Sequence, residues 1–235
     1  MLATASVADM SETSRVKAVL FDIDGTLVDS NYLHVDAWMR GIDEAGETAQ
    51  AARVHEGIGL DSAKLLERLF GERADSDAVA RAKDLHGEYY AASADRLRRF
   101  ADVHELFTAL RERGVTVVLA SSAPQEELDI LLRVLDADEL IDDATSSSDV
   151  DTAKPEPDLI AVALSKAGVE AGEALMVGDT RWDVEAARRA GVDTVAVLTG
   201  GRGEHELRDA GAVAVYADIA DLLQHLEEAL GARQR

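Results

Sequence analysis

Residues 16–30 read VKAVLFDIDGTLVDS. The stretch begins with an almost unbroken apolar run, which is typical of a buried strand in a parallel sheet. The run ends abruptly at Asp22, and Asp24 and Gly25 follow. Because residues two apart in an extended chain point to the same face, the carboxylates of Asp22 and Asp24 are expected side by side at the strand end. Open α/β sheets bind ligands at this edge, so the stretch predicts where the site lies.

Similar short apolar runs recur along the chain, with helical periodicity between most of them. They lie at residues 115–120, 174–178, 194–198 and 213–216. Strands that alternate with helices predict a mainly parallel sheet covered on both faces. We therefore expect an α/β fold with a Rossmann-like, doubly wound sheet.

The segment between residues 30 and 100 breaks this alternation. It contains no convincing strand, and its apolar residues recur at helical spacings, as in Leu65, Leu66 and Leu69. Several ordinary crossover helices are one interpretation, but a crossover needs only about a dozen residues or slightly more. The length favours a separate helical domain at residues 30–100, inserted into a core at residues 15–29 and 101–235. Residues 1–14 are small and polar, and we expect a disordered or frayed tail there.

Composition excludes several classes of protein. The 46 Asp and Glu residues outnumber the 24 Lys and Arg residues, and the net charge of −22 argues against nucleic acid or a membrane as partner. The chain has no Cys, which excludes thiolate metal sites and cysteine nucleophiles. We find neither a secretory signal nor a long apolar run, and we expect a cytoplasmic protein.

A second acidic cluster follows the apolar run at residues 174–178. Asp179 ends that run, and parallel strands would bring it to the same edge as Asp22 and Asp24. Three converging carboxylates without Cys or a His pair describe a hard oxygen site suited to Mg²⁺. Asp183 lies one helical turn further on, where it either completes the metal site or caps the helix.

Two further segments carry groups that can bind an anion. Ser121 and Ser122 follow the run at 115–120 and precede a helix, so they offer hydroxyl and backbone N–H groups, although such residues also serve as simple caps. Lys154 precedes Pro155 in a loop of restricted backbone. The sequence GGRG at 200–203 favours a flexible connection over a phosphate-binding loop, because no helix-opening Gly pattern or Lys follows it.

Four motifs therefore occur in order and span most of the chain. They are DxDGT at 22–26, Ser121 after a strand, Lys154 before a proline, and GDTxxD at 178–183. The set resembles the haloacid dehalogenase superfamily of phosphohydrolases. In that superfamily a helical cap domain is inserted just after the first motif, where residues 30–100 lie. Residues 198–212 look like the phosphoglycolate phosphatase-like branch.

The resemblance implies roles for individual residues. Asp22 would be the nucleophile that forms an aspartyl-phosphate, and Asp24 would be the general acid and base. The cofactor Mg²⁺ would be held by Asp22, the backbone carbonyl of Asp24, and Asp179, with Asp183 as a further candidate. Ser121 and Lys154 would bind the phosphoryl oxygens, and we add Ser122 and Thr26 as substrate-binding candidates. This assignment makes Asp22, Asp24, Ser121 and Lys154 the catalytic set.

The cap supplies further candidates for substrate binding. His34 lies near the site if the hinge is at residues 27–31, although beside Trp38 it could equally pack as a helix residue. Arg53 and His55, with the loop at 56–60, would reach back over the site. A solvated surface position is the alternative for Arg53.

A sugar-phosphate mutase of the β-phosphoglucomutase type is the nearest rival, and the chain resembles it through His34 and Trp38. Such mutases carry an acidic residue just before the first Asp of the last motif, and basic residues in the cap loop. This chain has Gly178 at that position and neither Lys nor Arg at 56–60. A dehalogenase is disfavoured because its nucleophile motif lacks the second Asp that Asp24 supplies.

A non-catalytic phosphoacceptor or binding module, like a receiver domain, is the third alternative. It needs neither a closing cap nor Asp24. We therefore expect a Mg²⁺-dependent phosphatase, a phosphoric monoester hydrolase, acting on a small phosphorylated metabolite such as a phosphoglycolate-like or sugar phosphate ester. It is expected to work as a monomer or homodimer.

Overall fold

The computed structural model describes residues 16–149 and 154–232, and the predicted tail at 1–14 lies outside them. A six-stranded parallel sheet, in the order β5-β4-β1-β6-β7-β8, forms the centre of the molecule. Its strands are β1 (Ala18–Phe21), β4 (Thr116–Ala120), β5 (Asp143–Thr145), β6 (Ala174–Gly178), β7 (Asp193–Val197) and β8 (Ala214–Tyr216). The chain runs outward from β1 through β4 and β5, and then returns to lay β6, β7 and β8 on the other side. The predicted doubly wound α/β fold is confirmed.

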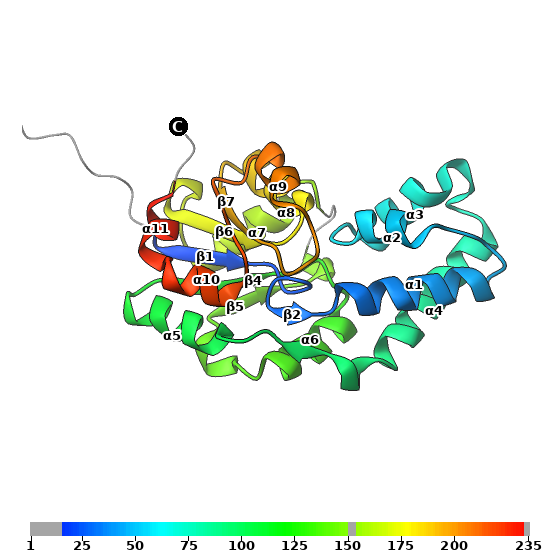
Figure 1. Cartoon of the computed structure of the whole chain (residues 1–235), viewed down its shortest axis with the longest axis horizontal. Helices are drawn as coiled ribbons and strands as arrows, with labels where there is room; N and C mark the ends of the chain where they lie inside the picture. The colour runs from blue at the N-terminus through cyan, green and yellow to red at the C-terminus, as the bar shows by residue number, and fades with distance from the viewer. Residues whose placement is uncertain (1–15, 150–153, 233–235) are drawn as a thin grey trace, which may run out of the picture.

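Helices cover both faces of this sheet (Figure 1). One face packs against α5 (Val103–Glu112), α6 (Gln125–Leu135), α10 (Ile219–Gln224) and α11 (Leu226–Gly231). The other face packs against α7 (Asp158–Ala167), α8 (Arg181–Arg189) and α9 (Glu204–Ala210). Alternate residues of β1 serve the two faces, because Phe21 packs into one cluster and Leu20 into the other.

The register of β1 places the ends of two strands next to each other. Phe21 pairs with Leu119 of β4 on one side and with Val177 of β6 on the other. The order of the strands reverses between β1 and β6, which makes this crevice the topological switch point where such folds bind ligands. The backbone N–H of Asp22 still donates to the Val177 carbonyl at 2.9 Å, so the acidic residue begins where the sheet ends.

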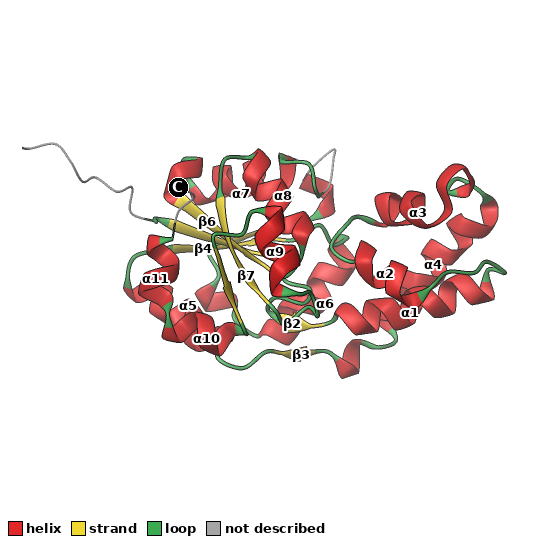
Figure 2. Ribbon diagram, turned by 45° about the horizontal axis from the view of Figure 1, so that its top comes forward, coloured by secondary structure: helices red, strands yellow, loops and turns green. Residues whose placement is uncertain are grey.

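The inserted segment lies off the carboxyl end of β1 (Figures 1 and 2). Its helices are α1 (Asn31–Glu44), α2 (Ala51–Gly57), α3 (Ser62–Phe70) and α4 (Asp77–Ala91), which we call the cap. They enclose an apolar cluster of their own that includes Trp38, Leu65 and Phe70. The two connections to the core pair as short antiparallel strands, β2 (Val28–Asp29) and β3 (Arg98–Arg99).

Three short strands, β2, β3 and β5, depart from the sequence prediction. The segment 30–100 was expected to contain no strand, yet β3 lies within it, because Arg98 and Arg99 pair with the connection that enters the cap. The edge strand β5 was not predicted, because its residues Asp-Ala-Thr lack an apolar run. Within residues 16–149 and 154–232, no helix is long and apolar enough to cross a membrane.

Phe107 of α5 is fully buried, and its ring centroid lies 5.1 Å from that of Phe21. We expect Phe107→Ala to lower the free energy of unfolding by about 3–5 kcal/mol, because it leaves a cavity between α5 and β1. Urea unfolding followed by circular dichroism measures this change. The control, Thr108→Ala, alters an exposed neighbour on the same helix and should change stability by less than about 0.5 kcal/mol. Equal effects of the two substitutions would contradict the packing described.

Candidate active site

Three buried carboxylates meet at the crevice between β1 and β6. Asp22 follows β1, Asp179 follows β6, and Asp183 lies in the first turn of α8. One carboxylate oxygen from each lies within 4.8 Å of the others. The pKa of Asp22 is raised to about 7, chiefly by burial; Lys154 acts to lower it, and the nearby charges of Asp183 and Asp24 act to raise it. Burial also raises the pKa of Asp179 well above its ordinary value, with Asp183 and Asp22 adding to the effect.

This donor set fits a divalent metal ion. Carboxylate oxygens are the ligands that Mg²⁺ prefers, and a cation among them offsets the mutual repulsion that burial makes expensive. The candidate ligands Asp22, Asp179 and Asp183 therefore lie together as the sequence predicted, and Asp24 lies beside Asp22 with its side chain turned toward the cap.

Lys154 is fully buried beside these carboxylates. Its ammonium lies 2.5 Å from Asp22 Oδ1 and 2.7 Å from Asp183 Oδ1. Burial acts to lower the pKa of Lys154, but the charges of Asp183 and Asp22 outweigh it and raise the pKa above its ordinary value. Lys154 is thus a permanent cation that orients the Asp22 carboxylate.

Asp183 both caps a helix and belongs to the site, so the two alternatives for this residue are compatible. Its Oδ2 accepts hydrogen bonds from the backbone N–H of Thr180 at 3.0 Å and from the Thr180 hydroxyl at 2.6 Å. Together with the return bond from the Asp183 N–H to Thr180 Oγ1, this forms a capping box at the start of α8. Its other oxygen remains for Lys154 or a metal ion.

Asp179 is held in place from three directions. Thr26 Oγ1 donates to Asp179 Oδ1 at 3.0 Å, and Asn31 Nδ2 donates to Asp179 Oδ2 at 2.8 Å. An ideal Cβ at Gly200 would lie only 1.6 Å from Asp179 Oδ2, so the backbone approaches closely there. The predicted substrate residue Thr26 is buried and orients carboxylates instead of lining the cavity. Asn31 and Gly200 were not predicted as site residues.

Asp24 faces the cap and accepts three hydrogen bonds at the same oxygen. Ser30 Oγ lies 2.6 Å, His34 Nε2 3.2 Å and the Tyr90 hydroxyl 3.4 Å from Asp24 Oδ1. Burial acts to raise the pKa of Asp24, but the charge of His34 and the hydrogen bonds from His34 and Ser30 lower it below its ordinary value. The same pairing raises the pKa of His34 despite its burial. His34 therefore lies at the site as the sequence predicted.

A second histidine continues this chain of contacts. His86 Nε2 of α4 lies 3.1 Å from His34 Nδ1, and the His86 ring stacks on Trp38 with centroids 4.0 Å apart. Burial lowers the pKa of His86 well below its ordinary value, and the charge of His34 lowers it further. Sequence reasoning missed His86 and Tyr90, because the helical periodicity of α4 predicted the helix without marking which residues face α1.

The residues after β4 supply the remaining wall of the site. Ser121 is buried, and its Oγ accepts the N–H of Ala123 at 3.1 Å, while Ser122 is half-buried. Both line the cavity near the start of α6. Glu127, in the first turn of α6, also lines it, and burial raises the pKa of Glu127. No motif marked Glu127 in the sequence.

The other cap candidates lie away from the cavity. Arg53 is exposed and donates to the carbonyl of Arg68 at 2.8 Å, within the cap. His55 stacks on Tyr32 and contacts the Gly200 carbonyl through Nε2 at 3.0 Å. Neither residue lines the cavity.

The segment GGRG at 200–203 makes contacts between cap and core, which the interpretation as a flexible connection did not anticipate. Arg202 is buried and donates to the His55 carbonyl, and His55 in turn contacts Gly200. Trp182, at the start of α8, donates to the Glu56 carbonyl at 3.2 Å. The end of α2 therefore contacts one loop of the core, at 200–203, and the start of helix α8.

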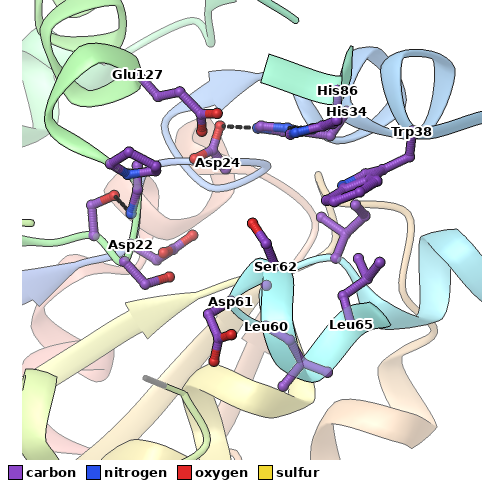
Figure 3. A pocket seen from close by; sticks show the side chains of 16 residues that line it. Asp22, Asp24, His34, Trp38, Leu60, Asp61, Ser62, Leu65, His86 and Glu127 are labelled. Carbon is purple, nitrogen blue, oxygen red and sulfur yellow. Dashed lines mark hydrogen bonds and ion pairs between the residues drawn. The ribbon is translucent and has the colours of Figure 1, made fainter. Parts of the chain in front are cut away.

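A cavity of about 80 Å³ lies between the two parts of the molecule (Figure 3). Asp22, Asp24 and Ser121 line its core side, and Trp38, Leu65 and His86 line its cap side. A space of this size between a charged edge and a cap suits a small molecule.

These features are typical of an α/β phosphohydrolase. Carboxylates lie at the ends of neighbouring parallel strands beside a buried lysine, and a helical cap covers a small cavity. A sequence profile of haloacid dehalogenase-like hydrolases matches residues 19–197, and the chain belongs to this family. The protein is an enzyme of the phosphatase class within it.

Similar proteins carry several names. A phosphoglycolate phosphatase from Rhodospirillum rubrum is 34% identical over 88% of this chain and 89% of its own length. A pyrophosphatase PpaX from Halalkalibacterium halodurans is 28% identical over 88% of this chain and 95% of its own. The crystal structure of a hydrolase from Pseudomonas syringae matches with a TM-score of 0.86 and 33% identity, covering 90% of this chain and 98% of that one.

Gly200→Ala tests the close approach to Asp179. The new methyl group would displace the Asp179 carboxylate, so we expect the rate of phosphate release to fall at least about tenfold, with a higher Mg²⁺ concentration needed for half-maximal rate. The control is Gly203→Ala, because a Cβ at Gly203 would meet nothing within 4 Å. An unchanged Mg²⁺ requirement in Gly200→Ala would contradict this placement.

The raised pKa of Asp22 predicts a pH-dependent stability in the metal-free protein. The folded state keeps a proton on Asp22 up to pH of about 7, whereas the unfolded chain releases it near 3.8. The stabilisation is therefore complete below the unfolded pKa and is lost as the pH rises through the folded one. With chelator present, the free energy of unfolding of the wild type should fall by on the order of 1–4 kcal/mol more than that of Asp22→Asn as the pH rises from about 4 to 8. If the free energy of unfolding depends on pH in the same way in both proteins, the raised pKa of Asp22 is refuted.

Proposed function

We propose that the protein is a Mg²⁺-dependent phosphatase that hydrolyses a small phosphomonoester, phosphoglycolate-like or a sugar phosphate, through an aspartyl-phosphate on Asp22. The observation that carries the proposal is the pairing of Asp22 with the buried ammonium of Lys154, at the floor of a cavity that Asp24 also lines. A carboxylate fixed in this way through Oδ1 would present its other oxygen, Oδ2, to an incoming phosphorus atom.

Lys154 and the segment after β4 would bind the phosphoryl group. The ammonium of Lys154 pairs with Asp22, and Ser121, shortly before the start of α6, lines the cavity together with Asp22. Donors at these positions stabilise the charge that spreads over the equatorial oxygens in the transition state. Ser122, which is half-buried in the same wall, would add a further donor.

Asp24 would handle the proton in both halves of the reaction. It would protonate the leaving oxygen, and then accept a proton from the water that attacks the aspartyl-phosphate. His34, 3.2 Å from Asp24 Oδ1, would hold the proton that Asp24 passes on. The Ser30 and Tyr90 hydroxyls keep the Asp24 carboxyl turned toward the cap.

Asp22, Asp179 and Asp183, with the backbone carbonyl of Asp24, would hold the metal ion. When bound, Mg²⁺ would offset the negative charge of nucleophile and phosphate. Thr26 and Asn31 would keep Asp179 oriented toward the ion.

Two features disfavour the mutase alternative. A Cβ at Gly178 would lie 2.5 Å from Asp183 Cβ, so an acidic side chain cannot fit there beside this Asp183. The loop at 56–60 carries neither Lys nor Arg to hold a second phosphate. A β-phosphoglucomutase from Clostridium difficile has the same fold at 18% identity and a TM-score of 0.79, over 92% of this chain and 97% of its own, which establishes the fold alone.

The partner would be a small phosphorylated metabolite, since the cavity under the cap admits little else. A cytoplasmic monomer or homodimer remains our expectation. The non-catalytic alternative is disfavoured by the contacts of Asp24, which a phosphoacceptor module would not need.

Asp24→Asn tests the assignment directly. We expect chelator-sensitive phosphate release from alkyl phosphate esters by the wild type, and a loss of about 10²–10⁴ in kcat in the variant, because Asn can neither donate nor accept the proton. Binding of a phosphate analogue, measured by calorimetry, should persist because Lys154 and Ser121 are unchanged. An unaltered rate would refute the role of Asp24, and a chelator-insensitive rate would refute that of the metal.

A further inference from the structure

The ionisable side chains that line the cavity are acids and histidines. Among the described residues that line it, there is no Lys or Arg. Four of the lining residues are acidic, namely Asp22, Asp24, Asp61 and Glu127. Once the phosphoryl group lies on Asp22, the leaving group must therefore extend into a space whose ionisable groups are acids and histidines.

The nearby cations are engaged elsewhere. Lys154 pairs with Asp22 and Asp183, beneath the cavity floor. The ammonium of Lys64, on α3, lies 3.5 Å from the carbonyl of Lys154. His34 pairs with Asp24, and His86, next to it, stays neutral because of its burial. None of these groups is placed to balance a second anion on the leaving group.

Apart from Asp61 and His34, the cap side presents neutral hydrogen-bonding groups among apolar side chains. Figure 3 shows the Glu127 carboxyl beside that of Asp24, and the Ser62 hydroxyl pointing into the space opposite them. The Trp38, Leu60 and Leu65 side chains complete this wall. Glu127 makes no hydrogen bond to another described residue, so its oxygens remain for a ligand.

We propose that the substrate's leaving group is an uncharged hydroxyl-bearing alcohol, a polyol or sugar, and that Glu127 selects it against leaving groups that carry a carboxylate or a second phosphate. The proposal rests on the phosphatase function proposed above and narrows it. Hydroxyl groups can donate to Glu127 and exchange hydrogen bonds with Ser62, whereas an anion would face Glu127 and Asp61 without a counter-charge. Burial within a closed cap makes that repulsion costly.

A cationic leaving group suits the cavity less well. Asp61 is already the N-cap of α3, where its Oδ1 accepts the N–H groups of Ala63 at 2.8 Å and Lys64 at 3.0 Å. The ring of Trp38 is 3% exposed and stacks on His86, so it offers little open aromatic surface to an ammonium group. The acids and the aromatic ring therefore do not form a cage for a cation.

Esters matched in size and differing in charge test the proposal. Three pairs compare a neutral with an anionic leaving group: 2-hydroxyethyl phosphate with phosphoglycolate, glycerol 3-phosphate with 3-phosphoglycerate, and glucose 6-phosphate with 6-phosphogluconate. O-phosphoethanolamine supplies the cationic counterpart of the first pair. We expect kcat/KM to be at least about tenfold higher for the neutral member of the best pair than for its anionic or cationic counterpart.

Charge reversal at Glu127 tests the selecting residue. Glu127→Lys should lower the ratio of neutral to anionic kcat/KM at least about tenfold, because the new ammonium attracts the carboxylate. Glu126→Lys is the matched control, since Glu126 is exposed on the same turn of α6 and does not line the cavity. It should leave the ratio unchanged. Equal ratios in the two variants would overturn the role of Glu127.

Hydrolysis of p-nitrophenyl phosphate separates failure of this proposal from failure of the proposed function. If that ester is hydrolysed with Mg²⁺ but the anionic or cationic members are preferred, or all three pairs are inert, the leaving-group proposal is overturned and the phosphatase stands. If p-nitrophenyl phosphate is also inert, the phosphatase function itself fails and this proposal fails with it.

Discussion

The rest of the site depends on the buried ion pairs that the ammonium of Lys154 makes with Asp22 and Asp183. Three carboxylates lie within 4.8 Å of one another in the interior, an arrangement that costs free energy unless positive charge accompanies it. Lys154 provides one permanent positive charge, and a metal ion would provide the rest. Removing Lys154 would leave buried acids without compensation, so the residue serves both the fold and the chemistry.

The sheet positions the carboxylates, and the cap covers the cavity in front of them. The switch point between β1 and β6 fixes Asp22 and Asp179 at strand ends, and there is no room for a side chain at Gly178, the last residue of β6, or at Gly200 in the loop after β7. The cap brings His34 to Asp24 and lines its side of the cavity with apolar and hydroxyl groups and the carboxyl group of Asp61. With the functions proposed above, the chemistry common to every phosphate ester would lie in the core, and discrimination among leaving groups would lie where α1, α3 and α6 meet.

Sequence reasoning recovered the residues whose position follows from local structure. Asp22, Asp179 and Lys154 each follow a strand or precede a proline, so a short motif fixes where they lie. The alternation of strands and helices gave the doubly wound sheet for the same reason. The edge strand β5 was not predicted, because a strand at the edge of a sheet does not need an apolar run.

Residues placed by tertiary packing could not be found in this way. His86 reaches His34 only because α4 packs along α1, and Glu127 faces the cavity only because of how α6 is rotated. At Gly200 there is no room for a side chain, because the loop after β7 passes directly against the Asp179 carboxylate. For Arg53, the sequence left open a place over the site or a surface position, and the side chain is exposed and donates to the Arg68 carbonyl without lining the cavity.

The proposed role of Asp22 as nucleophile can be tested by rapid acid quench of Asp24→Asn during its reaction with p-nitrophenyl phosphate. This ester needs no acid to expel its leaving group, whereas breakdown of an aspartyl-phosphate still needs the missing base. We expect a burst of one p-nitrophenolate per enzyme, followed by slow turnover, and a phosphoryl group on the peptide that contains Asp22. Phosphate release without a burst, or a phosphoryl group on another residue, would contradict that role.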